Sequence, residues 1–198
     1  MSSENIHTIE KRLIPRKKKA EFLGHRGGVF WMCGLSGSGK STLAISLEKS
    51  LLKEGINSII LDGDNLRAGL NKDLGFSMIE RMENIRRVSE VAKIMVSNGM
   101  IVIVSLISPT IELRECARQI IGEEDFFEIF VRSSFEKCQK RDVKGLYEKS
   151  LKGEIKSFTG KDSQFEEPVN PWLIIDTEIA TETDSMTKLL TEVLKKIR

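Results

Sequence analysis

Eight consecutive residues match the pattern of a phosphate-binding loop: Gly34-Leu35-Ser36-Gly37-Ser38-Gly39-Lys40-Ser41, followed by Thr42. Glycine tolerates backbone angles that other residues avoid, so the N–H groups of such a loop can turn inward around phosphate oxygens. The pattern assigns Lys40 to the β- and γ-phosphates of a nucleotide and the Ser41 hydroxyl to Mg²⁺. The first expectation is therefore a nucleotide-binding site.

The residues on both sides of this loop have the secondary structure that the motif requires. Residues 29–33 read Val-Phe-Trp-Met-Cys, an apolar run that is typical of a buried strand. After the loop, leucines at positions 43, 47 and 51 recur with the spacing of one helix face, and Gly55 marks the helix end. A chance glycine-rich turn would lack this strand–loop–helix context.

The remainder of the chain alternates apolar strands with amphipathic helices. Strands are predicted over 56–61, 100–107, 126–131 and 172–176, and helices over 79–97, 109–121, 135–141 and 186–197. This alternation predicts an α/β fold of three layers, with a doubly wound parallel sheet between helices. The lysine-rich, weakly periodic residues at about 141–171 are predicted to form a lid over the site; the alternative is a plain surface loop.

Composition narrows the function classes. The 198 residues, 40% hydrophobic and 30% charged, are typical of one globular domain. A net charge of +2 does not indicate a nucleic-acid partner, and no apolar run approaches the ~20 residues of a membrane span. Residues 1–7 lack the apolar core of a signal peptide, so we expect a cytoplasmic protein. Residues 1–27 are a basic arm, expected to be solvated or packed as a short helix.

Polar residues follow other predicted strands at the edge where parallel sheets bind ligands. Asp62 and Asp64 follow the second strand; such acids contact Mg²⁺ or accept a proton from an attacking hydroxyl, or else they cap the next helix. Ser108 follows the third strand, and its hydroxyl either touches a ligand or caps the next helix. Arg81 and Asn84 are three residues apart on a helix and share a face that can hold an anion or be merely solvated.

Several separate motifs occur in the order found in the adenylylsulfate kinase (APS kinase) family, which the chain resembles from Gly27 to Asp176. They are GLSGSGKST at 34–42, LDGDNLR at 61–67, DLGFS at 73–77, RMENIRR at 81–87, ISP at 107–109, KGLY at 144–147 and FTGKD at 158–162. The resemblance implies a kinase domain of the P-loop nucleoside-phosphate type over 28–198, with a five-stranded parallel sheet, a mobile lid and a homodimer. It also implies transfer of the ATP γ-phosphoryl group, with Mg²⁺, to the ribose 3′-hydroxyl of adenosine 5′-phosphosulfate in sulfate assimilation.

Catalytic roles fall on positions that match these motifs. Asp64 is expected to take the proton of the 3′-hydroxyl, and Asp62 to support Mg²⁺ together with Ser41. Lys40 is expected to stabilise charge on the transferring phosphoryl group. Ser108 matches the position that the family assigns to a phosphoserine intermediate, and direct in-line transfer between clamped substrates is the alternative.

The nucleotide positions follow in the same way. Phe76 and Phe158 are expected to sandwich the adenine of the acceptor, and Arg141 to lie near the adenine of ATP. By resemblance and charge, the sulfonucleotide site comprises Arg67, Phe76, Arg81, Asn84, Ile107, Ser108, Lys144, Leu146 and Phe158.

The chain departs from the family pattern beside the predicted nucleotide edge. Ala68 stands where the family typically has His, and Thr110-Ile111 stands where it has an aromatic residue and then Arg. These departures leave two alternatives: a kinase on the same scaffold with another nucleotide 3′-hydroxyl as acceptor, and an inert nucleotide-binding homologue.

Overall fold

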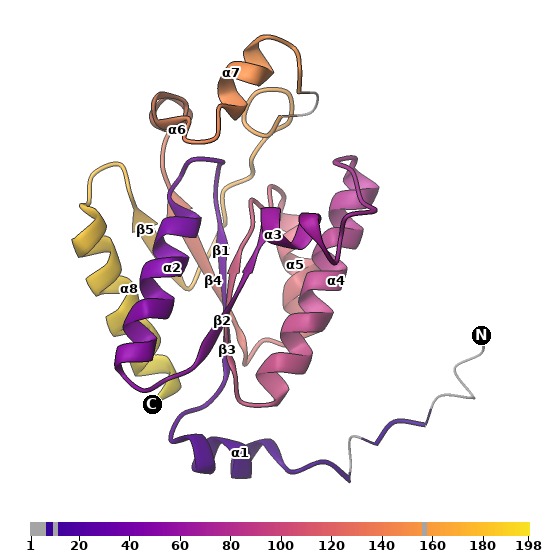
Figure 1. Cartoon of the computed structure of the whole chain (residues 1–198), viewed down its shortest axis with the longest axis vertical. Helices are drawn as coiled ribbons and strands as arrows, with labels where there is room; N and C mark the ends of the chain where they lie inside the picture. Colours follow the sequence, from indigo (N-terminus) through magenta and orange to yellow (C-terminus); the bar gives the residue numbers. More distant parts are fainter. Residues whose placement is uncertain (1–6, 10–11, 156–157) are drawn as a thin grey trace.

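The structure is a computed structural model that describes residues 7–9, 12–155 and 158–198, so part of the predicted basic arm lies outside the described residues. Five strands form one parallel sheet in the order β2-β3-β1-β4-β5 (Figure 1). This confirms the predicted parallel sheet. The strands are β1 (Gly28–Cys33), β2 (Ser58–Asp62), β3 (Ile101–Ser105), β4 (Phe126–Arg132) and β5 (Leu173–Asp176).

Helices cover both faces of the sheet, which completes the three predicted layers (Figure 1). One face carries α2 (Lys40–Lys53) and α8 (Glu182–Ile197); the other carries α4 (Met78–Ser97) and α5 (Ile111–Ile121). The shorter helices are α1 (Arg16–Leu23), α3 (Gly63–Ala68), α6 (Phe135–Arg141) and α7 (Leu146–Leu151).

The central strand β1 shows why the core has two halves. Successive side chains of a strand point to opposite faces of the sheet. Phe30 and Met32 accordingly pack with α2 and α8, whereas Val29 and Trp31 pack with α4 and α5, and all four are fully buried. A strand buried on both faces reads as a continuous apolar run, which is what its sequence shows.

Side-chain caps set the helix starts, and some differ from the predicted bounds. Ser77 and Glu80 form a capping box at the start of α4. Thr181 caps α8, which therefore begins at Glu182 rather than at the predicted residue 186. Thr110 caps α5, so this helix begins two residues after the predicted residue 109.

Two short helices, α3 and α7, escaped the sequence prediction because six residues carry too little periodicity. Both lie at the ligand edge of the sheet. A third short helix, α1, forms within the basic arm, where a packed short helix was one of the two expectations, and an ion pair between Arg16 and Asp125 ties it to the body. It lies at the end of the molecule opposite α6 and α7 (Figure 1).

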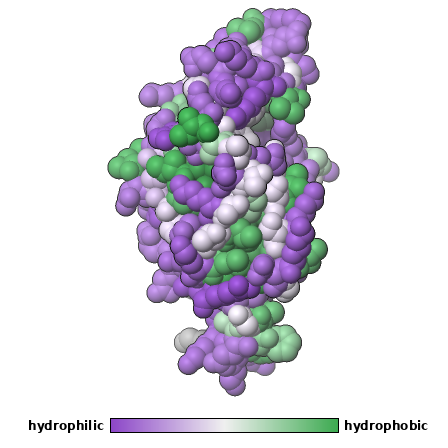
Figure 2. Space-filling view, turned by 90° about the vertical axis from the view of Figure 1, so that its left-hand side faces the viewer, coloured by the Kyte–Doolittle hydropathy of each residue, from purple (hydrophilic) through white to green (hydrophobic). Residues whose placement is uncertain are grey.

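The loops at the carboxyl ends of the strands lie together beneath α6 and α7 (Figure 1). Seen from the side of α8, the part above the sheet is largely hydrophilic, whereas hydrophobic residues gather on the body (Figure 2). Each helix of the described chain is too short or too polar to cross a bilayer.

Candidate functional site

A cavity of about 780 Å³ opens at this edge of the sheet and collects most of the predicted site residues. Its lining comes from the phosphate loop, the segment after β2, the start of α4, the end of β3 and the residues around α6 and α7. Gly34, Leu35 and Ser38 are the predicted residues outside the lining. The predicted residues in the lining are Ser36, Gly37, Gly39, Lys40, Ser41, Thr42, Asp62, Asp64, Arg67, Phe76, Arg81, Asn84, Ile107, Ser108, Arg141, Lys144, Leu146 and Phe158.

The phosphate loop has the geometry of an anion cradle. Gly34, Gly37 and Gly39 have positive φ angles of 146°, 77° and 102°. A Cβ atom on Gly34 would lie 2.4 Å from the carbonyl oxygen of Val131, so the loop is pressed against β4. No side chain caps the N-terminus of α2, which leaves its first N–H groups for an anion.

Lys40 is the buried cation of this loop. Its side chain donates hydrogen bonds to the carbonyl oxygens of Gly34 (2.9 Å) and Leu35 (2.7 Å). Burial lowers the pKa of Lys40 to about 8. A phosphate in the loop would replace carbonyl dipoles with full negative charges around the ammonium group, so the free cradle is electrostatically prepared for an anion.

Oxygen ligands for a cation meet at the ends of β2, β3 and the start of α2. The Ser41 hydroxyl donates to an Asp62 carboxylate oxygen (2.8 Å) and lies 3.3 Å from the Ser105 hydroxyl. A hydroxyl beside a carboxylate suits Mg²⁺. Within the described residues no cluster of three His, Cys, Asp or Glu side chains exists, so an ion here would take further oxygens from phosphates and water.

The two acids of the Asp-Gly-Asp segment have different surroundings. Asp62 also accepts a hydrogen bond from the Asp64 amide (3.1 Å) and caps α3, so the capping alternative holds for Asp62 alongside its contact with Ser41. Asp64 extends into the cavity with its side chain 70% exposed and forms an ion pair with Lys144. The proposed base and a predicted substrate contact thus face each other.

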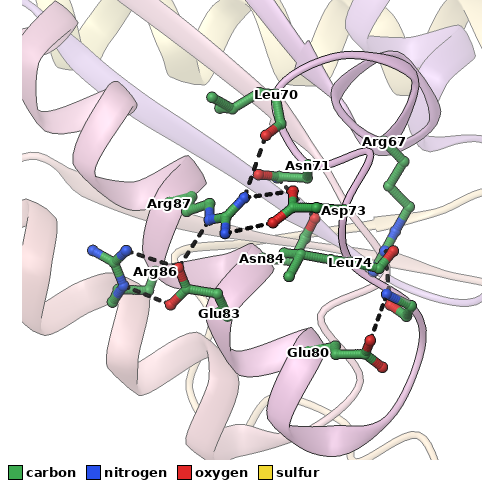
Figure 3. A network of polar contacts seen from close by, with 11 residues as sticks. Arg67, Leu70, Asn71, Asp73, Leu74, Glu80, Glu83, Asn84, Arg86 and Arg87 are labelled. Carbon is green, nitrogen blue, oxygen red and sulfur yellow. Dashed lines mark hydrogen bonds and ion pairs between the residues drawn. The ribbon is translucent and has the colours of Figure 1, made fainter.

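Arg67 of α3 and Arg81 at the start of α4 form a cationic wall along the cavity. Figure 3 shows Arg67 beside the loop that leads to α4. Arg67 donates to the carbonyl oxygens of Leu74 (3.1 Å) and Gly75 (2.8 Å), and its guanidinium lies 4.2 Å from the ring centre of Phe76. Burial lowers the pKa of Arg67 and Arg81. Holding Arg67 through peptide oxygens rather than carboxylates leaves its charge available to an anion.

Arg81 and Asn84 complete this wall. Arg81 donates to the carbonyl oxygen of Phe76 (2.9 Å) and to the Thr159 hydroxyl (3.1 Å), which joins α4 to the predicted lid segment. The Asn84 side-chain oxygen accepts from Asn71 (2.9 Å), which fixes the amide in the buried base of the wall (Figure 3). Both side chains line the same cavity, as their spacing predicted.

The two predicted adenine-binding rings sit in different environments. Phe76 is 60% exposed and has Arg67 against its ring. Phe158 is buried, with its ring edge-on to Tyr147 at a centroid distance of 4.8 Å. Both rings line the cavity, and the sandwich stays a prediction.

Ser108 occupies an unusual position at the end of the third predicted strand. It is buried, has a positive φ of 44°, and its hydroxyl accepts a hydrogen bond from the Trp31 indole (3.0 Å). The alternative that Ser108 caps the next helix is wrong. The cap of α5 is Thr110, whose hydroxyl accepts a hydrogen bond from the Leu113 amide.

The segment that the sequence predicts to be a lid rests directly on the phosphate loop. Arg141 donates to the carbonyl oxygens of Gly37 (3.2 Å) and Thr177 (2.6 Å), and the Tyr147 hydroxyl donates to the carbonyl oxygen of Ser36 (2.8 Å). Any movement of residues 141–147 therefore changes the hydrogen bonds that these residues make to the phosphate loop.

Sequence reasoning missed several residues of the site, among them Ser105, Tyr147 and Thr177. Ser105 and Thr177 stand at or just after the ends of β3 and β5, so the strand-end rule applied to every strand would have found them. Tyr147 is the last residue of the KGLY motif, but its role as a link to the phosphate loop has no sequence signal.

Comparisons with known proteins show which family this chain belongs to. Residues 26–176 match the family model described as adenylylsulphate kinase. An adenylyl-sulfate kinase of Phocaeicola vulgatus is 52% identical over 194 residues, covering 98% of this chain and 95% of the relative. The Mycobacterium tuberculosis APS kinase CysC, solved with AMPPNP and APS, is 45% identical with a TM-score of 0.79, covering 86% of this chain and 97% of that one.

A further solved relative has a stated assembly. The hexameric APS kinase from Thiobacillus denitrificans is 30% identical with a TM-score of 0.61, and the match covers 87% of this chain and 29% of that one.

Proposed function

The chain belongs to the adenylylsulphate kinase family, and from this we propose how its site moves the ATP γ-phosphoryl group to the ribose 3′-hydroxyl of adenosine 5′-phosphosulfate. One observation carries the assignment of roles. A single cavity joins the phosphate loop to the cationic wall of Arg67 and Arg81, with the Asp64 carboxylate also in its lining. One substrate can then lie on each side of a proton acceptor, which is the arrangement that phosphoryl transfer needs.

ATP binds with its phosphates in the loop and at the start of α2. Lys40 exchanges its hydrogen bonds to two loop carbonyl oxygens for hydrogen bonds to phosphate oxygens. It thereby stabilises the negative charge on the phosphoryl group during its transfer. Arg141, held between Gly37 and Thr177, lies at the base of the lid and faces the adenine. Ser41 and Asp62 would hold Mg²⁺, which would neutralise phosphate charge.

The acceptor binds on the other side of the cavity. Arg67, Arg81 and Asn84 hold its phosphosulfate, because guanidinium and amide donors suit a bulky anion. Phe76 and Phe158 flank its adenine. Ile107, Lys144 and Leu146 line the remainder of the subsite.

Asp64 accepts the proton of the 3′-hydroxyl. In the free protein its carboxylate is paired with Lys144, and both side chains are at least half exposed. Exposed ion pairs are weak, so the arriving acceptor displaces this contact at little cost. Lys144 is then free to contact the sulfonucleotide.

Transfer is direct and in line. The Ser108 hydroxyl is buried against Trp31, which supports a role in shaping the acceptor site rather than one as a phosphorylated intermediate. A phosphoserine would need this hydroxyl to leave the indole and to face the γ-phosphate.

We propose further that the enzyme is a cytoplasmic homodimer. Its three cysteines are free, as in a reducing compartment, and its reaction consumes ATP. Large apolar side chains stand exposed on α1 and α4, notably Phe22 (89%), Ile79 (83%) and Ile94 (65%), and would be covered in a dimer. Light scattering on the purified chain measures its oligomeric state.

The test of function is ADP release with Mg-ATP and a set of acceptors: adenosine 5′-phosphosulfate, AMP, CDP and none. Turnover only with the sulfonucleotide is expected. Turnover only with another acceptor would show that Ala68 and Thr110-Ile111 mark a changed specificity. Binding of ATP without any turnover would indicate an inert homologue.

A further inference from the structure

A buried arginine behind the acceptor site makes more contacts than an ion pair requires. Arg114 of α5 is 3% exposed, and its Nε lies 2.7 Å from a carboxylate oxygen of Glu128 in β4. Its two Nη atoms donate to peptide oxygens: one to Ser108 (2.7 Å) and the other to Glu166 (2.7 Å). The guanidinium therefore has three separate partners, one carboxylate and two peptide oxygens.

The first of these peptide oxygens belongs to a strained residue at the substrate edge. Ser108 has a φ of 44°, a conformation that costs free energy in a residue with a side chain. Arg114 holds its carbonyl group, and Trp31 holds its hydroxyl. Two buried donors thus fix a conformation that the local sequence would not adopt by itself.

The second peptide oxygen belongs to the segment that returns from the lid. The Glu166 amide donates to the Pro109 carbonyl oxygen (2.8 Å), and the Glu166 carboxylate accepts from the Ile111 amide (2.7 Å). Phe165 stacks on Phe130 with ring centres 5.9 Å apart. The end of the lid is thereby tied beside the end of β3.

A purely structural role is the competing explanation. Burial raises the pKa of the Glu128 carboxyl, and Arg114 and Arg118 oppose that rise. Leaving such a carboxylate without its partner is strongly destabilising, whereas replacing both charges by apolar groups is often tolerated. Stabilising the Glu128 carboxylate does not by itself require that Arg114 also contact Ser108 and Glu166.

We propose that Arg114 is a positioning residue for the acceptor: its guanidinium sets the spacing between Ser108 and the lid segment at Glu166. This rests on the acceptor site proposed above. Arg114 is outside the cavity lining and reaches the subsite through the Ser108 backbone, so its loss should affect acceptor binding far more than ATP binding.

The decisive variant is Arg114→Met combined with Glu128→Leu, which removes both buried charges at similar volume. We expect its melting temperature to stay within about 4 °C of the native value. We expect KM for the acceptor to rise about tenfold or more, the equivalent of one lost charge-assisted hydrogen bond, while KM for ATP changes less than about twofold.

Two further variants complete the design. Arg118→Met is the matched control, because Arg118 also pairs with Glu128 (3.3 Å) but has no contact with Ser108 or Glu166. It should leave both KM values unchanged. Arg114→Lys keeps the charge but cannot reach three partners with one ammonium group, so it should raise the acceptor KM as the double variant does.

The outcomes separate this inference from the proposed function. A double variant that binds the acceptor like the native protein, or that fails to fold, would overturn the positioning role. Native protein without turnover on any acceptor would remove the proposed function and this inference together. Active native protein with a selective loss in the double variant supports both.

Discussion

The Asp64→Asn substitution tests the heart of the proposed mechanism, because it removes a proton acceptor while it keeps the shape of the side chain. Asp64 lines the cavity, has 70% of its side chain exposed and has Lys144 as its ion-pair partner. Asp62, by contrast, caps α3 and contacts Ser41, so changing it would disturb the cation site as well. Of these two acids, Asp64 is therefore the one that can be substituted with the smaller structural consequence.

The structure sets the expected magnitudes. An ion pair this exposed contributes about 0.2–1 kcal/mol to folding, which moves the melting temperature by about 4 °C at most. Loss of a general base lowers turnover by about 10²–10⁴-fold, or about 3–5 kcal/mol in the barrier. The catalytic loss should thus exceed the stability loss several times over.

The assay measures ADP release with Mg-ATP and adenosine 5′-phosphosulfate, and calorimetry gives the affinity for ATP. The matched control is Asp73→Asn: Asp73 is also exposed and ion-paired, to Arg87, but lies outside the cavity lining (Figure 3). The control should keep native turnover. Native turnover in Asp64→Asn would refute the role of this carboxylate as base, and an equal loss of ATP affinity would show that it serves binding instead.

Three other perturbations address the lid, the cradle and the lysine. Phe158→Ala should raise KM for the acceptor more than KM for ATP; equal increases would mean that this ring, through Tyr147, closes the lid over the whole site. Gly34→Ala should weaken ATP binding sharply in calorimetry, because its Cβ would collide with the Val131 carbonyl oxygen at 2.4 Å and the positive φ adds strain of about 1–3 kcal/mol; an unchanged affinity would contradict the tight loop geometry. ATP affinity should be fully developed below pH 8 and fall as pH rises above it, since burial lowers the pKa of Lys40 to about 8 in the free protein and bound phosphates raise it again. Calorimetry in buffers of different ionisation enthalpy should detect proton uptake at about pH 9 that Lys40→Met abolishes, and its absence in the native protein would count against a neutral lysine in the empty loop.

Local patterns predicted the architecture because they are repeated along the chain. The apolar run of β1 is buried on both faces, as a continuous hydrophobic strand predicts. The ends of the helices were harder to predict than the helices themselves. The start of α8 depends on the Thr181 cap, which outweighs the weak apolar pattern of the first helical turn. Short helices such as α3 and α7 carry no usable period at all.

The candidate site was predictable where one rule applied to one short segment. Glycines and a lysine at fixed spacing specify the phosphate loop, and strand-end acids specify the Asp62–Asp64 segment, since parallel strands bring their carboxyl ends to one edge. No such rule connects Lys144 with Asp64, which are 80 residues apart, or the Tyr147 hydroxyl with Ser36.

The sequence by itself therefore determined the phosphate loop, the alternation of strands and helices, and the identity of the charged groups, because each depends on neighbours within a few residues. Tertiary structure alone decided which groups face one another. It pairs Asp64 with Lys144, holds the strained Ser108 between Trp31 and Arg114, and brings the Tyr147 hydroxyl to the phosphate loop. Those contacts are long-range, and burial in a common core, rather than any local preference, holds the partners at bonding distance.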